Sequence, residues 1–135
     1  MMLLTKKFVF EMAHALDDYD GKCANLHGHS YHLEVCVGTT SVGTDGIAID
    51  FSAIKAIVQR AVIDRFDHAL VLSERSPFLA GGQAYGNLVA VPFNPTTENL
   101  LLHFASLLSP CMPAGATLHS LRLSETDTST AELIL

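Results

Sequence analysis

Two segments of alternating apolar residues, each sharing its apolar face with histidine, constrain this fold more than any other feature of the sequence. Side chains alternate between the two faces of a strand, so residues of one parity line one face. In residues 6–14 the apolar face ends at His14, and in residues 27–38 it begins with His27 and His29. The other members of the two faces are Phe8, Phe10, Met12, Tyr31, Leu33, Val35 and Val37. Antiparallel pairing of these strands would bring the three imidazoles together.

Two helices are expected after these strands. Asp50 is a suitable N-cap for a helix that continues to about Arg65, because a carboxylate can accept hydrogen bonds from the free N–H groups of a first helical turn. Its apolar stripe consists of Phe51, Ile54, Val58 and Ala61. A second helix is expected to begin within residues 95–98 and to end at Ser109-Pro110, where proline cannot continue it.

The remaining segments complete an α+β pattern. Residues 73–92 are expected to form a loop that contains Gly81-Gly82 and one short edge strand at 88–91. Two strands, 117–126 and 130–135, close the chain. The order ββααββ predicts one domain over residues 1–135, with an antiparallel sheet and two helices on one face. A sheet this small leaves its edge strands unpaired, so association of subunits is also expected.

Charge and hydropathy exclude several classes of protein. The net charge of −6 argues against a general nucleic-acid binder, because phosphate contacts need clustered lysine and arginine. No stretch approaches the roughly 20 apolar residues of a membrane span, and the start lacks the apolar region of a signal peptide. Cys23, Cys36 and Cys111 are an odd number without the spacing of a disulfide framework, which indicates a reducing, cytoplasmic setting.

The three histidines predict a metal site. His27 and His29 point the same way from one strand, and His14 ends the matching face of the other. Three neutral imidazoles without a fourth protein ligand are typical of catalytic zinc, which keeps one position open. Nitrogen ligands also suit iron, nickel or copper, so zinc is the favoured metal and not the sole candidate. The alternative is a pair of strand-end histidines that only form hydrogen bonds.

Cys23 lies four residues before His27, in a polar loop where a purely apolar role is a weak explanation. A thiol near a metal has a lowered pKa and can serve as a base or nucleophile. Two alternatives remain open from the residues alone. Cys23 could be a fourth ligand that closes a structural zinc site, or an exposed cysteine without a role.

Acidic residues and one further histidine complete the candidates. In Asp67-His68 a carboxylate can orient an imidazole for proton transfer near neutral pH. Glu125 ends an apolar strand face, where burial of a carboxylate requires strong donors such as the N–H groups of a guanidine-like heterocycle. Glu98 lies in a first helical turn, which the helix dipole alone would explain. Each of these signals is weak by itself.

Taken together, the segments resemble the family of 6-pyruvoyl-tetrahydropterin synthase and 6-carboxy-tetrahydropterin synthase (QueD). The matching pieces are Phe10-Glu11-Met12-Ala13-His14, Cys23 to Tyr31, Ile49-Asp50-Phe51, Asp67-His68, Pro95-Thr96-Thr97-Glu98-Asn99 and Glu125-Thr126. They cover the chain nearly end to end and follow the order of the family.

The resemblance implies the tunnelling fold (T-fold), assembled as a homohexamer of two stacked rings, a dimer of trimers, with sites between subunits. It implies that His14, His27 and His29 bind Zn²⁺ and that Cys23, Asp67 and His68 transfer protons. It implies that Glu125 anchors the ring nitrogens of a pterin, with Glu98 and Thr97 in a second contacting segment. The implied substrate is 7,8-dihydroneopterin triphosphate.

The product is the open point of this resemblance. QueD-type members cleave the side chain, release acetaldehyde and triphosphate, and form 6-carboxy-tetrahydropterin for queuosine and other deazapurines. Biopterin-type members retain the carbons as a 6-pyruvoyl group. The spacing of Cys23 favours the QueD type, but the long segment Ser73 to Phe93 departs from the short QueD pattern. A non-catalytic zinc-binding module of the same fold is the third alternative.

Overall fold

The computed structural model describes residues 1–80 and 84–135, so the predicted Gly81-Gly82 loop lies outside the described residues. Its centre is a long antiparallel hairpin of β1 (Met2–His14) and β2 (His27–Thr39), paired from Met2↔Thr39 to His14↔His27. β5 (Ala116–Thr126) pairs antiparallel with β2, and β6 (Ser129–Ile134) pairs antiparallel with β5. These are the four long strands that the sequence predicts.

The sheet is mixed and has six strands, which corrects the expectation of a wholly antiparallel sheet. β3 (Ala69–Ser73) pairs parallel with β1, and β4 (Leu88–Val91) pairs parallel with β3, in the order β4-β3-β1-β2-β5-β6. The predicted short strand at 88–91 is therefore confirmed as an edge strand, whereas β3 was not predicted. Residues 69–73 are nearly all buried, as expected for a short parallel strand covered on both faces.

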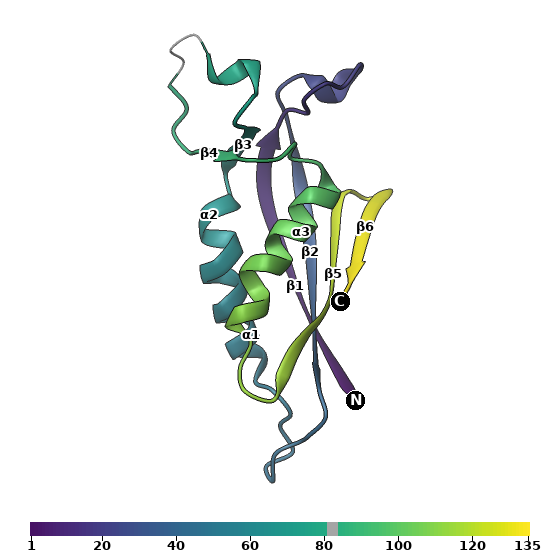
Figure 1. The fold of residues 1–135 in the computed structure, drawn as a ribbon. Coiled ribbons are helices and arrows are strands. Elements are labelled where there is room, and N and C mark those ends of the chain that lie inside the picture. The colour runs from purple at the N-terminus through teal and green to yellow at the C-terminus, as the bar shows by residue number, and fades with distance from the viewer. Residues whose placement is uncertain (81–83) are drawn as a thin grey trace.

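Helices cover one face of this sheet (Figure 1). The first helical stretch consists of α1 (Phe51–Val58), a π-helical stretch (Gln59–Ile63) and α2 (Asp64–Phe66). The Asp50 carboxylate caps it by accepting the N–H of Ser52 at 2.8 Å, as predicted. α3 (Thr97–Leu108) follows β4 and passes into a 3₁₀ turn at Ser109–Cys111, where proline was expected to end it.

The core lies between the helices and the predicted apolar strand faces. Phe10 of β1 stacks on Tyr31 of β2 at 5.3 Å between ring centroids and meets Phe104 of α3 edge-on at 6.2 Å. The other fully buried large side chains are Phe66, Leu33, Ile54, Leu72, Leu100, Leu108, Leu121, Leu123 and His14. None of the helices among the described residues is both long enough and apolar enough to cross a bilayer. The apolar faces are thus filled by helix packing, and His14 is held at the margin of that core.

Candidate metal centre and substrate pocket

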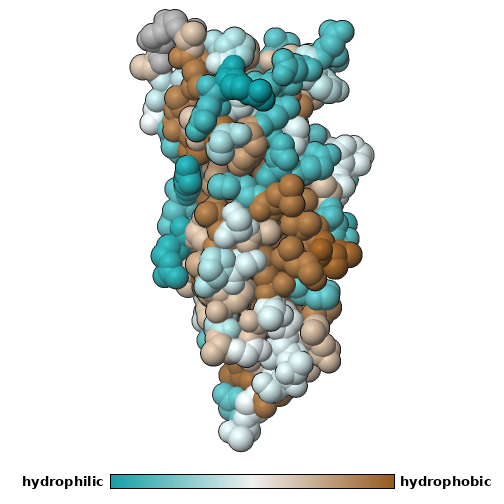
Figure 2. Space-filling model, in the orientation of Figure 1, coloured by the Kyte–Doolittle hydropathy of each residue, from teal (hydrophilic) through white to brown (hydrophobic). Residues whose placement is uncertain are grey.

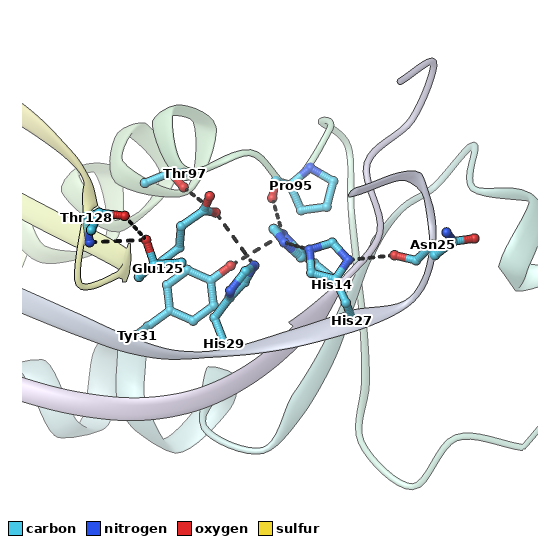
Figure 3. A network of polar contacts seen from close by, with 10 residues as sticks. His14, Asn25, His27, His29, Tyr31, Pro95, Thr97, Glu125 and Thr128 are labelled. Carbon is cyan, nitrogen blue, oxygen red and sulfur yellow. Dashed lines mark hydrogen bonds and ion pairs between the residues drawn. The ribbon is translucent and has the colours of Figure 1, made fainter. Parts of the chain in front are cut away.

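The three predicted histidines meet at the end of the sheet where β1 ends and β2 begins (Figure 3). The strand register pairs His14 with His27 and Met12 with His29, so all three side chains project from the helix-covered face. One ring nitrogen from each lies within 4.8 Å of the others, and among residues 1–80 and 84–135 this trio is the group of side chains that could hold a metal ion. The hairpin therefore assembles a three-nitrogen ligand set.

Main-chain carbonyls fix which nitrogen carries the proton in two of the three rings. His14 Nδ1–H donates to the carbonyl oxygen of Pro95 at 2.8 Å, and His27 Nδ1–H donates to that of Asn25 at 2.7 Å. A carbonyl can only accept, so the neutral rings carry their hydrogen on Nδ1 and their lone pair on Nε2. This arrangement is typical of metal-ligating histidines, whose second nitrogen is held by an outer partner.

The lone pairs of this cluster face one another. His14 Nε2 and His27 Nε2 are 2.9 Å apart, and the buried His29 Nε2 has no hydrogen-bond partner among the described residues. Two lone pairs at that distance repel unless a cation lies between them. The residues present therefore fit a metal ion, on the basis of their donor chemistry and of the unpaired nitrogen of His29.

Burial keeps the imidazoles of His14 and His29 in the form that binds metal. Removal of water from the imidazolium lowers the pKa of His14 to about 4, although the Pro95 carbonyl opposes that shift. Burial also lowers the pKa of His29, against the opposing effect of the Glu125 carboxylate. Metal binding needs neutral imidazole, so both residues are ready to bind at neutral pH without first losing a proton.

Glu125 lies beside the metal cluster together with the other predicted substrate residues. Its Oε2 accepts a hydrogen bond from Thr97 Oγ1 at 3.0 Å and lies 3.9 Å from His29 Nε2 (Figure 3). A small cavity of about 130 Å³ is lined by Glu125, Thr97 and Glu98, with Ser129 to Ala131 opposite. The structure thus brings together the three residues expected to contact the pterin, next to the histidines.

Tyr31 is a site residue that sequence reasoning placed only in the apolar face of β2. Its ring is fully buried, and its hydroxyl lies 3.4 Å from His14 Nδ1. Burial, with smaller effects of the Glu125 and Cys23 charges, raises the pKa of the phenol. Tyr31 therefore stays neutral and forms the wall of the metal cluster that faces the core. The signal available in the sequence was that Tyr31 shares one face of its strand with His27 and His29.

Cys23 lies in the 3₁₀ turn Lys22–Ala24, is half-buried and is a free thiol. Its carbonyl accepts the N–H of Leu16 at 2.9 Å, which ties this turn to the end of β1. In the part of the chain that the structure describes, Cys23 is not a member of the three-histidine group. The arrangement does not support the alternative of a fourth zinc ligand.

Asp67 and His68 form a pair, but among the described residues their side chains bond to each other and to Glu11, and not to the three histidines. Asp67 Oδ1 accepts the N–H of Glu11 at 2.9 Å and lies 3.0 Å from His68 Nδ1. The Glu11 N–H is the main reason that the pKa of Asp67 is lowered. His68 is exposed, and its backbone φ of +60° is one that residues other than glycine rarely adopt. The predicted dyad therefore exists, held against β1.

His68 of the dyad lines a second pocket of about 600 Å³, whose lining also includes Met12 and His29. Other lining residues belong to β1 and β2 and have a parity opposite to that of the metal histidines, namely Glu11, Ala13, Gly28 and Ser30. Residues 84–87 of the long segment before β4 supply another wall. The parity of these β1 and β2 residues indicates that His68 lies at the face of the sheet opposite the one from which the three histidines project, and His29 borders this pocket as well.

The fold and the histidine cluster define a T-fold protein with a candidate metal centre. A sequence profile described as 6-pyruvoyl tetrahydropterin synthase matches residues 3–134. The chain belongs to this family. Its relatives include proteins named 6-carboxy-5,6,7,8-tetrahydropterin synthase. The one from Haemophilus influenzae is 36% identical over 98% of both chains. The one from Synechocystis is 33% identical over 97% of this chain and 92% of its own.

Solved structures give the same fold. An uncharacterized protein from Wolinella succinogenes superposes with a TM-score of 0.84 at 19% identity, covering 98% of this chain and 97% of its own. The 6-pyruvoyl tetrahydropterin synthase of Plasmodium falciparum superposes with a TM-score of 0.72 at 22% identity, covering 98% and 96%. The predicted T-fold is thereby confirmed.

Proposed function

We propose that this chain is a zinc-dependent 6-carboxy-5,6,7,8-tetrahydropterin synthase. It would convert 7,8-dihydroneopterin triphosphate into 6-carboxy-tetrahydropterin, with release of acetaldehyde and triphosphate. The observation that carries the proposal is the cluster of three histidines, two of them oriented by main-chain carbonyls, beside the Glu125 carboxylate. The names of the bacterial relatives, over nearly the full chain, support the carboxy product. A cytoplasmic location and a role in queuosine synthesis belong to the same proposal.

Each side chain has a defined task in this proposal. Zinc held by His14, His27 and His29 would supply a Lewis acid for the hydroxyls of the substrate side chain. Glu125 would accept the paired N–H donors of the pterin ring, with Thr97 fixing its orientation and Glu98 bordering the same cavity.

Proton transfer would fall to Cys23 and to the Asp67–His68 pair. The thiolate of Cys23 would remove a proton from the side-chain carbon on one side of the substrate. On the other side, Asp67 would orient His68 through the 3.0 Å contact so that its imidazole gives and takes a proton.

The positions of the Asp67–His68 pair and of the histidine cluster are best explained by a site that is shared between chains. Because strand parity indicates opposite faces of one sheet for the dyad and the cluster, the dyad would serve the metal centre of a neighbour. The proposed assembly is a homohexamer, a dimer of trimers. It is supported by the two sheet edges, β4 and β6, and by the apolar side chains gathered near the end of β6 (Figure 2). There Ile134 and Leu135 are 70% and 57% exposed.

Incubation with 7,8-dihydroneopterin triphosphate, followed by mass spectrometry of the products, tests the proposed reaction. The expected result is 6-carboxy-tetrahydropterin with one acetaldehyde per turnover. A product that keeps all side-chain carbons would identify the pyruvoyl-forming synthase instead. Zinc binding without any turnover of this substrate would favour the non-catalytic T-fold module.

A further inference from the structure

The segment 94–97, which follows β4 and runs into the first residue of α3, contacts both halves of the candidate site. The Pro95 carbonyl accepts the Nδ1–H of His14, and Thr97 donates to Glu125. Thr96 caps α3 by accepting the N–H of Asn99 at 3.2 Å. The first residue of the segment, Asn94, has no role in the proposed reaction, yet it forms hydrogen bonds through both its side chain and its main chain.

Asn94 connects this segment to the chain that leaves His14. Its side-chain Oδ1 accepts the N–H of Asp17 at 2.8 Å, and its Nδ2 donates to the carbonyl of Asp17 at 3.3 Å. Both partners are main-chain atoms, three residues after His14. The Asn94 amide therefore forms a two-bond clamp between the end of β1 and the residue that precedes Pro95.

The main chain of Asn94 is held as well. Its carbonyl accepts the side-chain amide of Asn99 at 2.9 Å and the N–H of Thr96 at 2.7 Å. The ring of Pro95 fixes its own φ, and a residue before proline is restricted to extended conformations. With both sides of Asn94 held, the direction of the Pro95 carbonyl is determined, and with it the tautomer of His14.

We infer that Asn94 is a positioning residue for the metal centre. Its clamp holds the Pro95 carbonyl against His14 Nδ1, so that the Nε2 lone pair of this fully buried ring is kept toward the other two histidines. Removal of an outer-shell partner typically weakens metal affinity by about 10- to 100-fold. The inference rests on the proposed metal site, but the tautomer of His14 can be measured without metal or turnover.

Asn94→Ala is the main test, with two readouts. Zinc affinity, measured by competition with a chelator, should fall by about 10- to 100-fold. In the metal-free protein, ¹⁵N NMR of the His14 ring should change from one Nδ1–H tautomer to a mixture. Wild-type affinity together with a wild-type tautomer would overturn the inference. Failure of the wild type to bind zinc would count against the proposed function, while the tautomer would still test Asn94.

Asp17→Ala is a matched control at the other end of the clamp. It changes a side chain of the same loop, but both clamp bonds use main-chain atoms of Asp17 and stay intact. Affinity and tautomer should therefore remain as in the wild type. A loss equal to that of Asn94→Ala would show that loop integrity, and not the clamp, is responsible, and would reject the inference.

Asn94→Asp provides a second variant if the alanine variant fails to fold. It keeps the acceptor for the Asp17 N–H but lacks the donor to the Asp17 carbonyl, so its affinity should lie between those of the wild type and Asn94→Ala. A folded Asn94→Asp protein with unchanged affinity and tautomer would contradict the role of the clamp.

Discussion

Replacement of Glu125 by glutamine is the sharpest test of substrate recognition. The carboxylate accepts Thr97 Oγ1–H at 3.0 Å through one oxygen and borders the small cavity beside the histidines. Glutamine keeps the size and can keep the Thr97 bond through its carbonyl oxygen. It replaces the other acceptor by an N–H₂ group, which would confront an N–H of the pterin ring.

The expected magnitude follows from one donor left unpaired in a partly buried site. Such a loss costs about 1–3 kcal/mol, and each 1.4 kcal/mol is about tenfold, so binding of a pterin product analogue should weaken by about 5- to 150-fold. Zinc content should not change, because Glu125 lies 3.9 Å from His29 Nε2 and is assigned to the ring.

Calorimetry with the pterin analogue, alongside metal analysis, measures both quantities. Glu132→Gln is the matched control, because it makes the same chemical change on an exposed residue of β6 outside the cavity lining. Unaltered affinity in Glu125→Gln would refute the reasoning and leave ring recognition to Glu98 or to main-chain groups. Loss of zinc with the substitution would show that the carboxylate supports the metal.

The remaining predictions concern the metal, the thiol and the dyad. His29→Ala should lose zinc, whereas Cys23→Ala should keep zinc and lose at least about 10²-fold in rate. Metal analysis and turnover measurements distinguish the two effects. Loss of zinc in Cys23→Ala would mean that the thiol is a ligand. Cys23→Ala and His68→Ala chains, each inactive alone, should recover about a quarter of wild-type activity when co-assembled if sites are shared between chains, and an inactive mixture would argue against sharing. The pKa of His14 is about 4 in the folded protein and 6.5 for an unperturbed histidine, so unfolded chains bind more protons between these two pH values. The metal-free protein should therefore lose about 3 kcal/mol of unfolding free energy as pH falls through this window, and urea titrations that give equal stability at both ends would contradict the burial of neutral His14.

The histidine cluster was predictable because it depends on strand parity. Two alternating segments specify the faces of β1 and β2, and a one-residue shift of register would have exposed every apolar side chain. The register observed, with His14 opposite His27, is the one that buries Phe10 and Tyr31. The cap at Asp50 was likewise predicted, since a cap is a local hydrogen bond, and the Thr96 cap lies within the predicted start of the second helix.

Other features left no comparable signal in the sequence. β3 follows α2 after two residues, and its run of buried apolar residues lacks the alternation by which a half-exposed strand is recognised. The carbonyls of Pro95 and Asn25 that orient His14 and His27 are main-chain groups, which every residue possesses. The face on which the Asp67–His68 pair would lie also depends on the parallel pairing of β3 with β1, a contact between distant segments.

The position of the three ligands on a single hairpin has a consequence for the order of folding. All of them lie within residues 14–29, and contacts between near neighbours in sequence form early because the loop to be closed is short. The ligand set can therefore come together before the later strands dock. The Pro95 carbonyl reaches His14 from 81 residues away. In the proposed metal site the hairpin would therefore supply all three nitrogens as soon as it has emerged during synthesis, and the carbonyl that orients His14 would be added only with the segment 94–97.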